Sequence, residues 1–221
     1  MGLGSSGTHI SKTLLPLGKE TVIQRTVKTF LRTEALDEIA VMIRKSEEPA
    51  FKQELGNLGG RITLLEGGRT RKESVFNGLR YFQNKYEEQE NLYVVVHDAA
   101  RCFVTADVIN NSIQGALKHG AVTTAIPLVD SIKKISTDGQ VERSLDREGV
   151  RVIQTPQTFY FPLLLKAHLE GNSAATDDAC LVEPFHTVHV VEGDRLNFKI
   201  TEPEDCRLAE ALASLDYTSG K

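Results

Sequence analysis

The chain has 221 residues, of which 40% are hydrophobic and 25% are charged, which is typical of a soluble globular protein. Its formal net charge of −4 excludes a general attraction to nucleic acid or anionic membranes, so an anionic ligand must meet local groups of Lys and Arg. The three scattered cysteines form no C-x-x-C pair, and no apolar run reaches the ~18 residues of a membrane span. We therefore expect a cytoplasmic protein without a zinc site or a disulfide framework.

The first residues read MGLGSSG, in which Gly2, Gly4 and Gly7 match the G-x-G-x-x-G pattern of dinucleotide-binding loops. That pattern needs a strand before its first glycine, and none is visible here. A dinucleotide-dependent oxidoreductase is therefore a weak alternative that rests on these glycines alone.

Strand and helix patterns alternate along the rest of the chain. Strands are expected at 37–44, 61–65, 93–97, 121–129, 187–191 and 197–201, and helices at 20–31, 47–58, 69–86, 106–119, 161–169, 175–183 and 202–215. Thr176 is the expected N-cap of the helix at 175–183. This order predicts an α/β fold with a mainly parallel sheet in a single domain, 1–221.

One segment interrupts the alternation. Two strand-like runs flank Asp138-Gly139 within about 131–150, and D-G between such runs is a hairpin signal. The segment is therefore expected to be an inserted arm.

The stretch YVVVHDAAR at 93–101 combines a strand with candidate site residues. Its β-branched run predicts a central strand buried on both faces, with His97 and Asp98 at its carboxyl end. Ligands of open α/β sheets bind at that end, where Asp98 could hold a divalent cation and Arg101 could meet a phosphate. The alternative is that Asp98 caps a turn and Arg101 is solvated.

A second candidate lies at Gly67-Gly68 and the following run RTRKES. Glycines after a strand let the backbone approach a ligand, and a helix N-terminus with basic and hydroxyl side chains suits an anion. The alternative is an ordinary capped and solvated first turn.

Five cations lie beside strand ends or turns: Lys12, Arg71, Arg101, Arg147 and Lys199. Each alone is more often a solvated surface charge. Several of them gathered around Asp98 with Mg²⁺ would suit phosphoryl or nucleotidyl transfer. No H-x-x-x-H or G-x-S-x-G pattern favours a zinc enzyme or a serine hydrolase.

Six motifs in one order carry a family resemblance. They are EGGRTRKESV at 66–75, HDAAR at 97–101, LDR at 145–147, QTPQTF at 154–159, TDDACLVE at 176–183 and NFKITEPEDCRLAE at 197–210. Each motif is loose, but the set is specific, and the likeness runs from about residue 12 to 215. The chain resembles the 2-C-methyl-D-erythritol 4-phosphate cytidylyltransferase family.

The resemblance implies a Rossmann-like nucleotidyltransferase fold and a homodimer whose arms cross into the partner's site. It implies a Mg²⁺-dependent reaction of CTP with methylerythritol phosphate, which yields the CDP-alcohol and pyrophosphate in non-mevalonate isoprenoid biosynthesis.

The same resemblance assigns roles to matching positions. Lys12, Arg147 and Lys199 match catalytic and phosphate-positioning residues, and Asp98 matches the metal and substrate carboxylate. The cytidine-binding loop and helix start are matched by Gly67, Gly68 and Ser74. Substrate contacts are matched by Arg101, Ser131, Thr155 and Thr176.

One departure concerns the beginning of the family pattern. Relatives open with a strand and a glycine-rich A-A-G-x-G-x-R loop, which are not visible here, and Ser11 replaces a proline before the lysine. A missing central strand would expose apolar surface on its neighbours, so we expect low stability or impaired catalysis. Two alternatives stay open: a cytidylyltransferase for another polyol phosphate, such as ribitol 5-phosphate, and a truncated nucleotide-binding relative without turnover.

Overall fold

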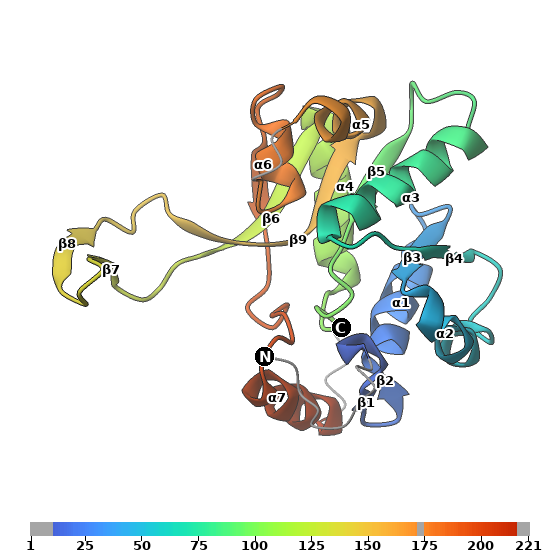
Figure 1. Ribbon diagram of the computed structural model, residues 1–221, viewed down its shortest axis with the longest axis horizontal. Coiled ribbons are helices and arrows are strands. Elements are labelled where there is room, and N and C mark those ends of the chain that lie inside the picture. Colours follow the sequence, from blue (N-terminus) through green and yellow to red (C-terminus); the bar gives the residue numbers. More distant parts are fainter. Residues whose placement is uncertain (1–10, 172–174, 216–221) are drawn as a thin grey trace.

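The computed structural model describes residues 11–171 and 175–215, so the glycines of residues 2–7 lie outside them. Strands and helices alternate to form an α/β body, and a long hairpin projects from it (Figure 1). No helix within the described ranges is long and apolar enough to cross a membrane.

In the described part of the chain the main sheet has four strands, in the order β10 (His189–Glu192), β6 (Ala121–Pro127), β9 (Arg151–Tyr160) and β5 (Tyr93–Val96). β6 and β10 are parallel, whereas β9 is antiparallel to both β6 and β5. The α/β architecture is as predicted, and β9 adds an antiparallel strand because it follows the hairpin rather than a crossover helix.

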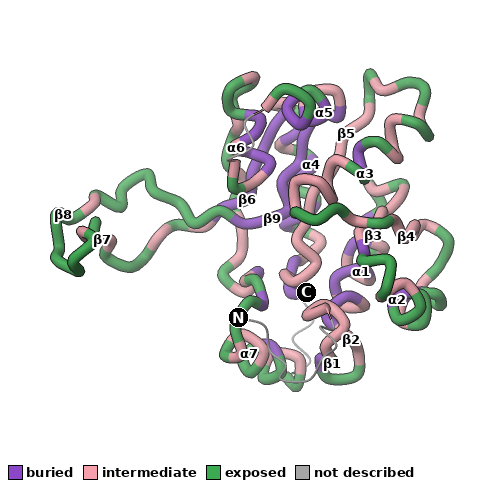
Figure 2. Tube along the Cα trace, viewed as in Figure 1, coloured by how far each residue is buried: buried purple, intermediate pink, exposed green. Residues whose placement is uncertain are grey.

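Three helices cover this sheet: α4 (Ala106–His119), α5 (Phe161–Glu170) and α6 (Asp178–Val182). Apolar side chains at their contact with the strands are fully buried, among them Phe159, Phe161, Leu164 and Val182. Figure 2 shows the buried positions gathered in β6, β9 and the adjacent helices. This core holds the strand ends of the candidate site in place.

A second, two-stranded parallel sheet consists of β3 (Ile39–Ile43) and β4 (Ile62–Glu66). Three helices accompany it: α1 (Val22–Arg32), α2 (Glu48–Leu55) and α3 (Arg71–Lys85). α1 begins with a capping box between Thr21 and Gln24 and buries the apolar face predicted from its helical spacing. Shorter elements are η1 (Lys12–Leu14), β1 (Pro16–Leu17), β2 (Glu20–Thr21) and η2 (Lys45–Glu47).

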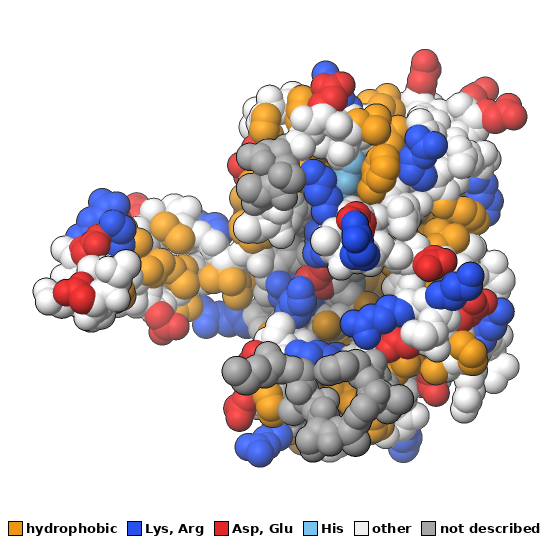
Figure 3. All heavy atoms as spheres, in the orientation of Figure 1, with side chains coloured by type: hydrophobic (Ala, Val, Ile, Leu, Met, Phe, Trp, Pro, Cys, Tyr) orange, Lys and Arg blue, Asp and Glu red, His pale blue; other side chains and the backbone are white. Residues whose placement is uncertain are grey.

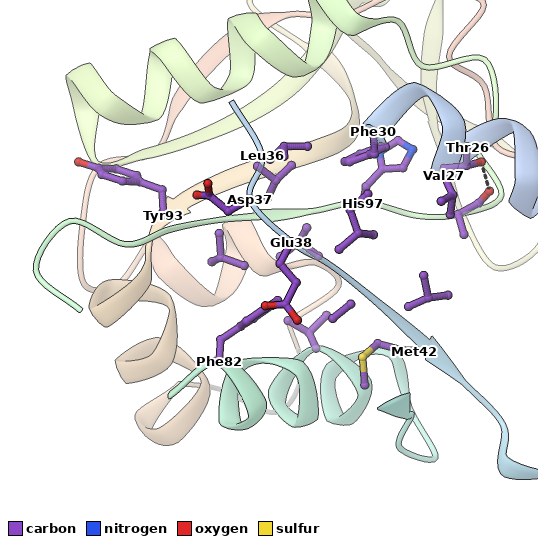
Figure 4. A pocket seen from close by; sticks show the side chains of 18 of the residues that line it. Thr26, Val27, Phe30, Leu36, Asp37, Glu38, Met42, Phe82, Tyr93 and His97 are labelled. Atoms are coloured by element: carbon purple, nitrogen blue, oxygen red, sulfur yellow. Dashed lines mark hydrogen bonds between the residues drawn. The ribbon is translucent and has the colours of Figure 1, made fainter. Parts of the chain in front are cut away.

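A slot separates the two sheets. Side chains from β3 and β5 line one cavity of about 430 Å³, together with Phe30, Phe82 and His97 (Figure 4). Within the described residues β3 pairs only with β4, and β5 pairs only with β9, so each strand has one edge without a ladder. Apolar side chains such as Val41 and Val95 line the cavity between these two edges.

The slot also corrects one prediction. The stretch at 93–97 was expected to be a central strand buried on both faces, but all four residues of β5 are only half-buried. Among the described strands β5 lies at the end of the main sheet, and the cavity beside it leaves its side chains partly accessible.

The inserted arm has the predicted hairpin form. β7 (Ile132–Ile135) pairs antiparallel with β8 (Val141–Leu145), and Gly139 in the connecting turn has φ +83°. A positive φ favours glycine, which explains the D-G signal. The arm extends away from the body and is mostly exposed (Figures 1 and 2).

Two predictions in the last third of the chain are wrong. The segment 197–201 is not a strand, because Ile200 N donates to Ala100 O and the segment joins no ladder. The N-cap of α6 is Asp177 rather than Thr176, because the Asp177 carboxylate accepts from Cys180 N at 2.8 Å. The final helix, α7 (Pro203–Ser214), begins with Pro203 as expected.

Candidate functional site

Asp98 is the second residue after β5 and is the centre of a charged cluster. Lys199 Nζ lies 2.8 Å from Asp98 Oδ2, Arg71 Nε lies 3.0 Å from Oδ1, and Arg101 Nε lies 4.0 Å from Oδ2. Burial would raise the pKa of the Asp98 carboxyl, but the Lys199 hydrogen bond and the nearby Arg71 charge lower it to about 2. Asp98 is therefore an anion among three cations.

Backbone contacts bring two distant segments together at this cluster. Ile200 N donates to Ala100 O at 2.9 Å, and Arg101 Nη1 donates to Asn197 O at 2.9 Å. The segment 197–200 is therefore attached to the loop after β5, and this attachment places Lys199 beside Asp98. Arg101 Nε is buried and has no hydrogen bond in the described part of the chain.

Thr155 and His97 fix the backbone under Asp98. Asp98 N donates to Thr155 Oγ1 at 3.0 Å, and Thr155 Oγ1 lies 3.0 Å from His97 Nδ1. His97 Nε2 lies 3.2 Å from Arg101 O, which can only accept, so Nε2 carries the proton and the Thr155 hydroxyl donates to Nδ1. Burial lowers the pKa of His97 to about 4, which agrees with a neutral imidazole.

The Gly67-Gly68 turn and Ser74 form one unit at the start of α3. Ser74 Oγ accepts from Gly68 N at 3.0 Å and donates to Thr70 O at 2.9 Å. A Cβ at Gly68 would lie 2.1 Å from Glu73 Cβ, so only glycine fits this close approach. The predicted grouping of these three residues is thus present, while their contact with a nucleotide stays a prediction.

Lys12 lies beside the segment that carries Lys199. Its Nζ donates to Thr201 O, and Thr201 N donates to Asp205 Oδ2 at 2.8 Å. Figure 3 shows Lys and Arg side chains crossing the middle of the face drawn, with single acidic groups among them. A chain of negative net charge thus presents local positive charge where an anionic ligand would need it.

Three further predicted residues, Ser131, Arg147 and Thr176, also lie outside the Asp98 cluster. Ser131 is exposed at the base of the arm, and Arg147 Nη1 donates to Val129 O near the same base. Thr176 is exposed on the rim of a second cavity of about 500 Å³, which Arg71 and Asp178 also line. The roles of these three residues stay predictions.

Sequence reasoning missed the second carboxylate of the site. Arg71 Nη1 lies 2.6 Å from Asp178 Oδ2, and Asp178 is fully buried. Arg71 entered the prediction only as one of five cations, and Asp178 only as part of a motif. The acidic pair Asp177-Asp178 at the start of a predicted helix was the available signal. Asp178 is 107 positions from Arg71 in the sequence, so spacing alone could not reveal their contact.

The donor set fits a divalent cation only together with a nucleotide. No group of three or more His, Cys, Asp and Glu side chains forms a metal site within residues 11–171 and 175–215. Mg²⁺ commonly binds through one or two carboxylates plus substrate phosphates and water. Asp98 is a carboxylate of that kind, at a strand end.

Comparison with known proteins gives matches over nearly the whole chain. The family model described as 2-C-methyl-D-erythritol 4-phosphate cytidylyltransferase matches residues 2–214. A protein of that name from Clostridioides difficile is 35% identical over 213 residues, which cover 94% of this chain and 87% of the relative. The one from Bacillus cytotoxicus is 36% identical over 212 residues, with 93% and 91% covered.

Two solved structures have the same fold. The 4-diphosphocytidyl-2C-methyl-D-erythritol synthase of Anaerococcus prevotii matches with a TM-score of 0.82 and 32% identity, covering 95% of this chain and 93% of that one. The 2-C-methyl-D-erythritol 4-phosphate cytidylyltransferase of Thermus thermophilus matches with a TM-score of 0.75 and 33% identity, covering 92% and 93%. With a charged cluster at a strand end and these matches over nearly its whole length, the chain belongs to the 2-C-methyl-D-erythritol 4-phosphate cytidylyltransferase family.

Proposed function

We propose that this protein transfers a cytidylyl group from CTP to 2-C-methyl-D-erythritol 4-phosphate in non-mevalonate isoprenoid biosynthesis. A phosphate oxygen of the alcohol phosphate attacks the α-phosphorus of CTP, the bond from that phosphorus to the bridging oxygen breaks, and pyrophosphate leaves. The products are the CDP-alcohol and pyrophosphate. The observation that carries this proposal is the convergence of Lys199, Arg101 and Arg71 on Asp98 in a member of this family.

The reaction needs charge neutralisation more than covalent chemistry from the protein. Lys12 and Lys199 lie on adjoining segments, and they would bind the triphosphate and the substrate phosphate, respectively. Arg101 and the buried Thr155 would hold the substrate beside Asp98, while Ser131 and Thr176 would contribute hydroxyl groups to it. Gly67, Gly68 and Ser74 would bind the cytidine at the start of α3.

Mg²⁺ would be held by Asp98 and by phosphate oxygens of CTP, and when bound it neutralises charge on the triphosphate. In the free protein Lys199 and Arg71 occupy both oxygens of the Asp98 carboxylate. Lys199 is 41% exposed, so its ammonium can move from Oδ2 to a substrate phosphate as the nucleotide arrives. Asp98 would thus stay charge-balanced with and without substrate.

The active form would be a homodimer in which the arm reaches the second subunit. Apolar side chains on the arm and its base are 37–61% exposed, namely Val129, Ile135, Val141, Val150, Val152 and Ile153. Such a row on a projecting hairpin is suited to burial against a second copy. Arg147 would then serve the partner's substrate phosphate. A cytoplasmic location is supported by the three cysteines, all of which are free thiols.

Pyrophosphate release tests the proposed function. With CTP and Mg²⁺ present, methylerythritol phosphate is expected to support release at least tenfold faster than ribitol 5-phosphate. Equal or faster release with ribitol 5-phosphate would instead assign the protein to another polyol phosphate. Nucleotide binding without release with either alcohol phosphate would leave a binding protein without turnover.

A further inference from the structure

Arg71 occupies an unusual position for a cation. It is the first residue of α3, after the N-cap Thr70, whose hydroxyl accepts from Glu73 N. The positive end of the helix dipole disfavours a guanidinium there. Arg71 is nevertheless two-thirds buried by its side chain, so its neighbours must compensate.

Two carboxylates from different elements provide that compensation. Arg71 Nε lies 3.0 Å from Asp98 Oδ1 after β5, and Arg71 Nη1 lies 2.6 Å from Asp178 Oδ2 in α6. Burial would lower the pKa of Arg71, but the charges of Asp178 and Asp98 raise it. The planar guanidinium holds the two contacts at fixed relative directions, which a lysine ammonium cannot do.

Asp178 has a second contact, made by the carboxylate oxygen that does not face Arg71. Its Oδ1 lies 3.0 Å from His168 Nε2, and the His168 ring is fully buried and stacks on Phe76 at 6.1 Å between ring centroids. The preceding Asp177 accepts from Gln157 Nε2 at 3.0 Å, which ties the start of α6 to β9. A series of side-chain contacts therefore connects α5 through α6 and α3 to Asp98 at the end of β5.

This series of contacts determines the orientation of the Asp98 carboxylate. Arg71 holds Oδ1 on the α3 side, and Asp98 N is held by Thr155 Oγ1. Oδ2 is left on the side of Lys199 and Arg101, where the proposed function places the reacting phosphates. Without Arg71 the carboxylate could rotate, and the oxygen presented to the substrate would no longer be defined.

We propose that Arg71, anchored by the buried Asp178–His168 pair, is a positioning residue that sets the orientation of the Asp98 carboxylate for cytidylyl transfer. The proposal rests on the proposed function and adds to it a residue that acts through Asp98. Asp178 acts one step further back, through Arg71, and so has no effect of its own on the reacting groups.

Kinetics of Arg71→Lys, Asp178→Asn and the double variant test the proposal. Misplacement of a reacting group by about 1 Å can cost ~10²-fold in rate, so Arg71→Lys is expected to lower kcat by roughly 10²-fold. Calorimetry with CTP and Mg²⁺ should show nucleotide affinity within about threefold of the unmodified protein. Asp178→Asn should lower kcat at least tenfold, and the double variant should be no slower than Arg71→Lys, because the two residues act in series.

Lys85→Gln is the matched control. Lys85 is the last residue of the same helix and pairs with Glu38 at 2.7 Å, so this variant also removes a cation–carboxylate contact of α3. Its kcat should equal that of the unmodified protein at a temperature where thermal melting shows both to be folded. Arg71→Lys keeps a charge at a partly exposed position, so the test stands on it even where Asp178→Asn does not fold.

The outcomes separate this proposal from the function on which it rests. An unmodified protein that releases no pyrophosphate from CTP and methylerythritol phosphate overturns the proposed function and the positioning role together. Turnover by the unmodified protein, with kcat of folded Arg71→Lys within twofold of it, overturns the positioning role alone. Losses that multiply in the double variant also overturn it, because they show Asp178 acting independently of Arg71.

Discussion

Lys199 has one partner in the free protein and a different one in the proposed complex. Its removal should therefore affect the alcohol phosphate more than CTP. In the free protein its ammonium neutralises Asp98, and in the proposed complex it meets the phosphate of the alcohol substrate. Removing one such charged donor typically costs 10²–10³-fold in rate.

We therefore expect Lys199→Ala to lower kcat/KM for methylerythritol phosphate by about 10²-fold, with CTP affinity nearly unchanged. Steady-state kinetics and calorimetry with CTP measure the two quantities. Lys52→Ala, at an exposed ion pair of α2 with Glu48, is the control and should change neither. An equal loss of CTP binding in Lys199→Ala would contradict the role assigned to it.

His97 links acid stability to the backbone beneath the site. Its pKa is lowered from 6.5 to about 4 chiefly by burial, so the unfolded chain binds a proton between these values and the folded protein does not. Stability is therefore fully present above about pH 6.5 and is lost as the pH falls toward 4.

From pH 7 to pH 5 this group should cost about 2 kcal/mol of unfolding free energy. Urea unfolding at the two pH values measures it. His97→Gln removes the titration and should lose about 2 kcal/mol less over the same interval. A variant as pH-sensitive as the unmodified protein would show that other groups cause the acid sensitivity.

Among the strands, β6 and the pair that borders the slot differ in hydrogen bonding. β6 has a ladder on both sides, to β10 and β9, whereas β3 and β5 each have a ladder on one side within the described residues. Amides that face an accessible cavity open to solvent more readily than those in a two-sided ladder.

Hydrogen exchange should therefore be faster for the peptides at 39–43 and 93–96 than for the peptide at 121–127. Peptide-resolved mass spectrometry measures this order directly. Equal protection in all three strands would mean that the slot is closed in solution and does not lower stability.

Local sequence signals predicted most helices and strands because each depends on neighbours along the chain. The α1 periodicity, the Asp138-Gly139 turn and Pro203 at the start of α7 are examples. The predicted strand at 197–201 was wrong because strand-like residues form a strand only where a ladder is available. Here Ala100 O accepts a single hydrogen bond, from Ile200 N. The prediction that β5 is buried on both faces was wrong for a related reason, because burial depends on what lies beside the strand.

The parts of the candidate site that could be predicted are those whose residues lie close together in one motif. Asp98 and Arg101 share one turn, and Gly67, Gly68 and Ser74 share one loop and helix start. The pairing of Arg71 with Asp178 spans 107 positions in sequence and could not be deduced from spacing. Lys199 was one of five cations considered as possible neighbours of Asp98, and the family resemblance added its role in positioning the substrate phosphate.

For the whole molecule, the projecting arm predicts shared active sites. Arg147 lies on the arm, away from the Asp98 cluster of its own chain, whereas Lys12 lies beside the segment of Lys199. If arms exchange between subunits, one site of a mixed dimer of Lys12→Ala and Arg147→Ala chains retains both residues.

Mixing the two inactive variants should therefore restore activity. The expected level is about a quarter of that of the unmodified protein if chains exchange at random, and about a half if every dimer is mixed. Activity is measured before and after mixing, with sedimentation to establish the dimer. Two variants that stay inactive after verified exchange would contradict the crossed arm.

Phosphorus-31 NMR of the reaction mixture tests the proposed cytidylyl transfer by identifying the product. The protein is incubated with CTP, Mg²⁺ and methylerythritol phosphate, in parallel with Asp98→Asn. We expect a new diphosphodiester and an equal amount of pyrophosphate with the unmodified protein, and neither with the variant. Unchanged CTP in both samples, or the same products from Asp98→Asn at the same rate, would contradict this expectation.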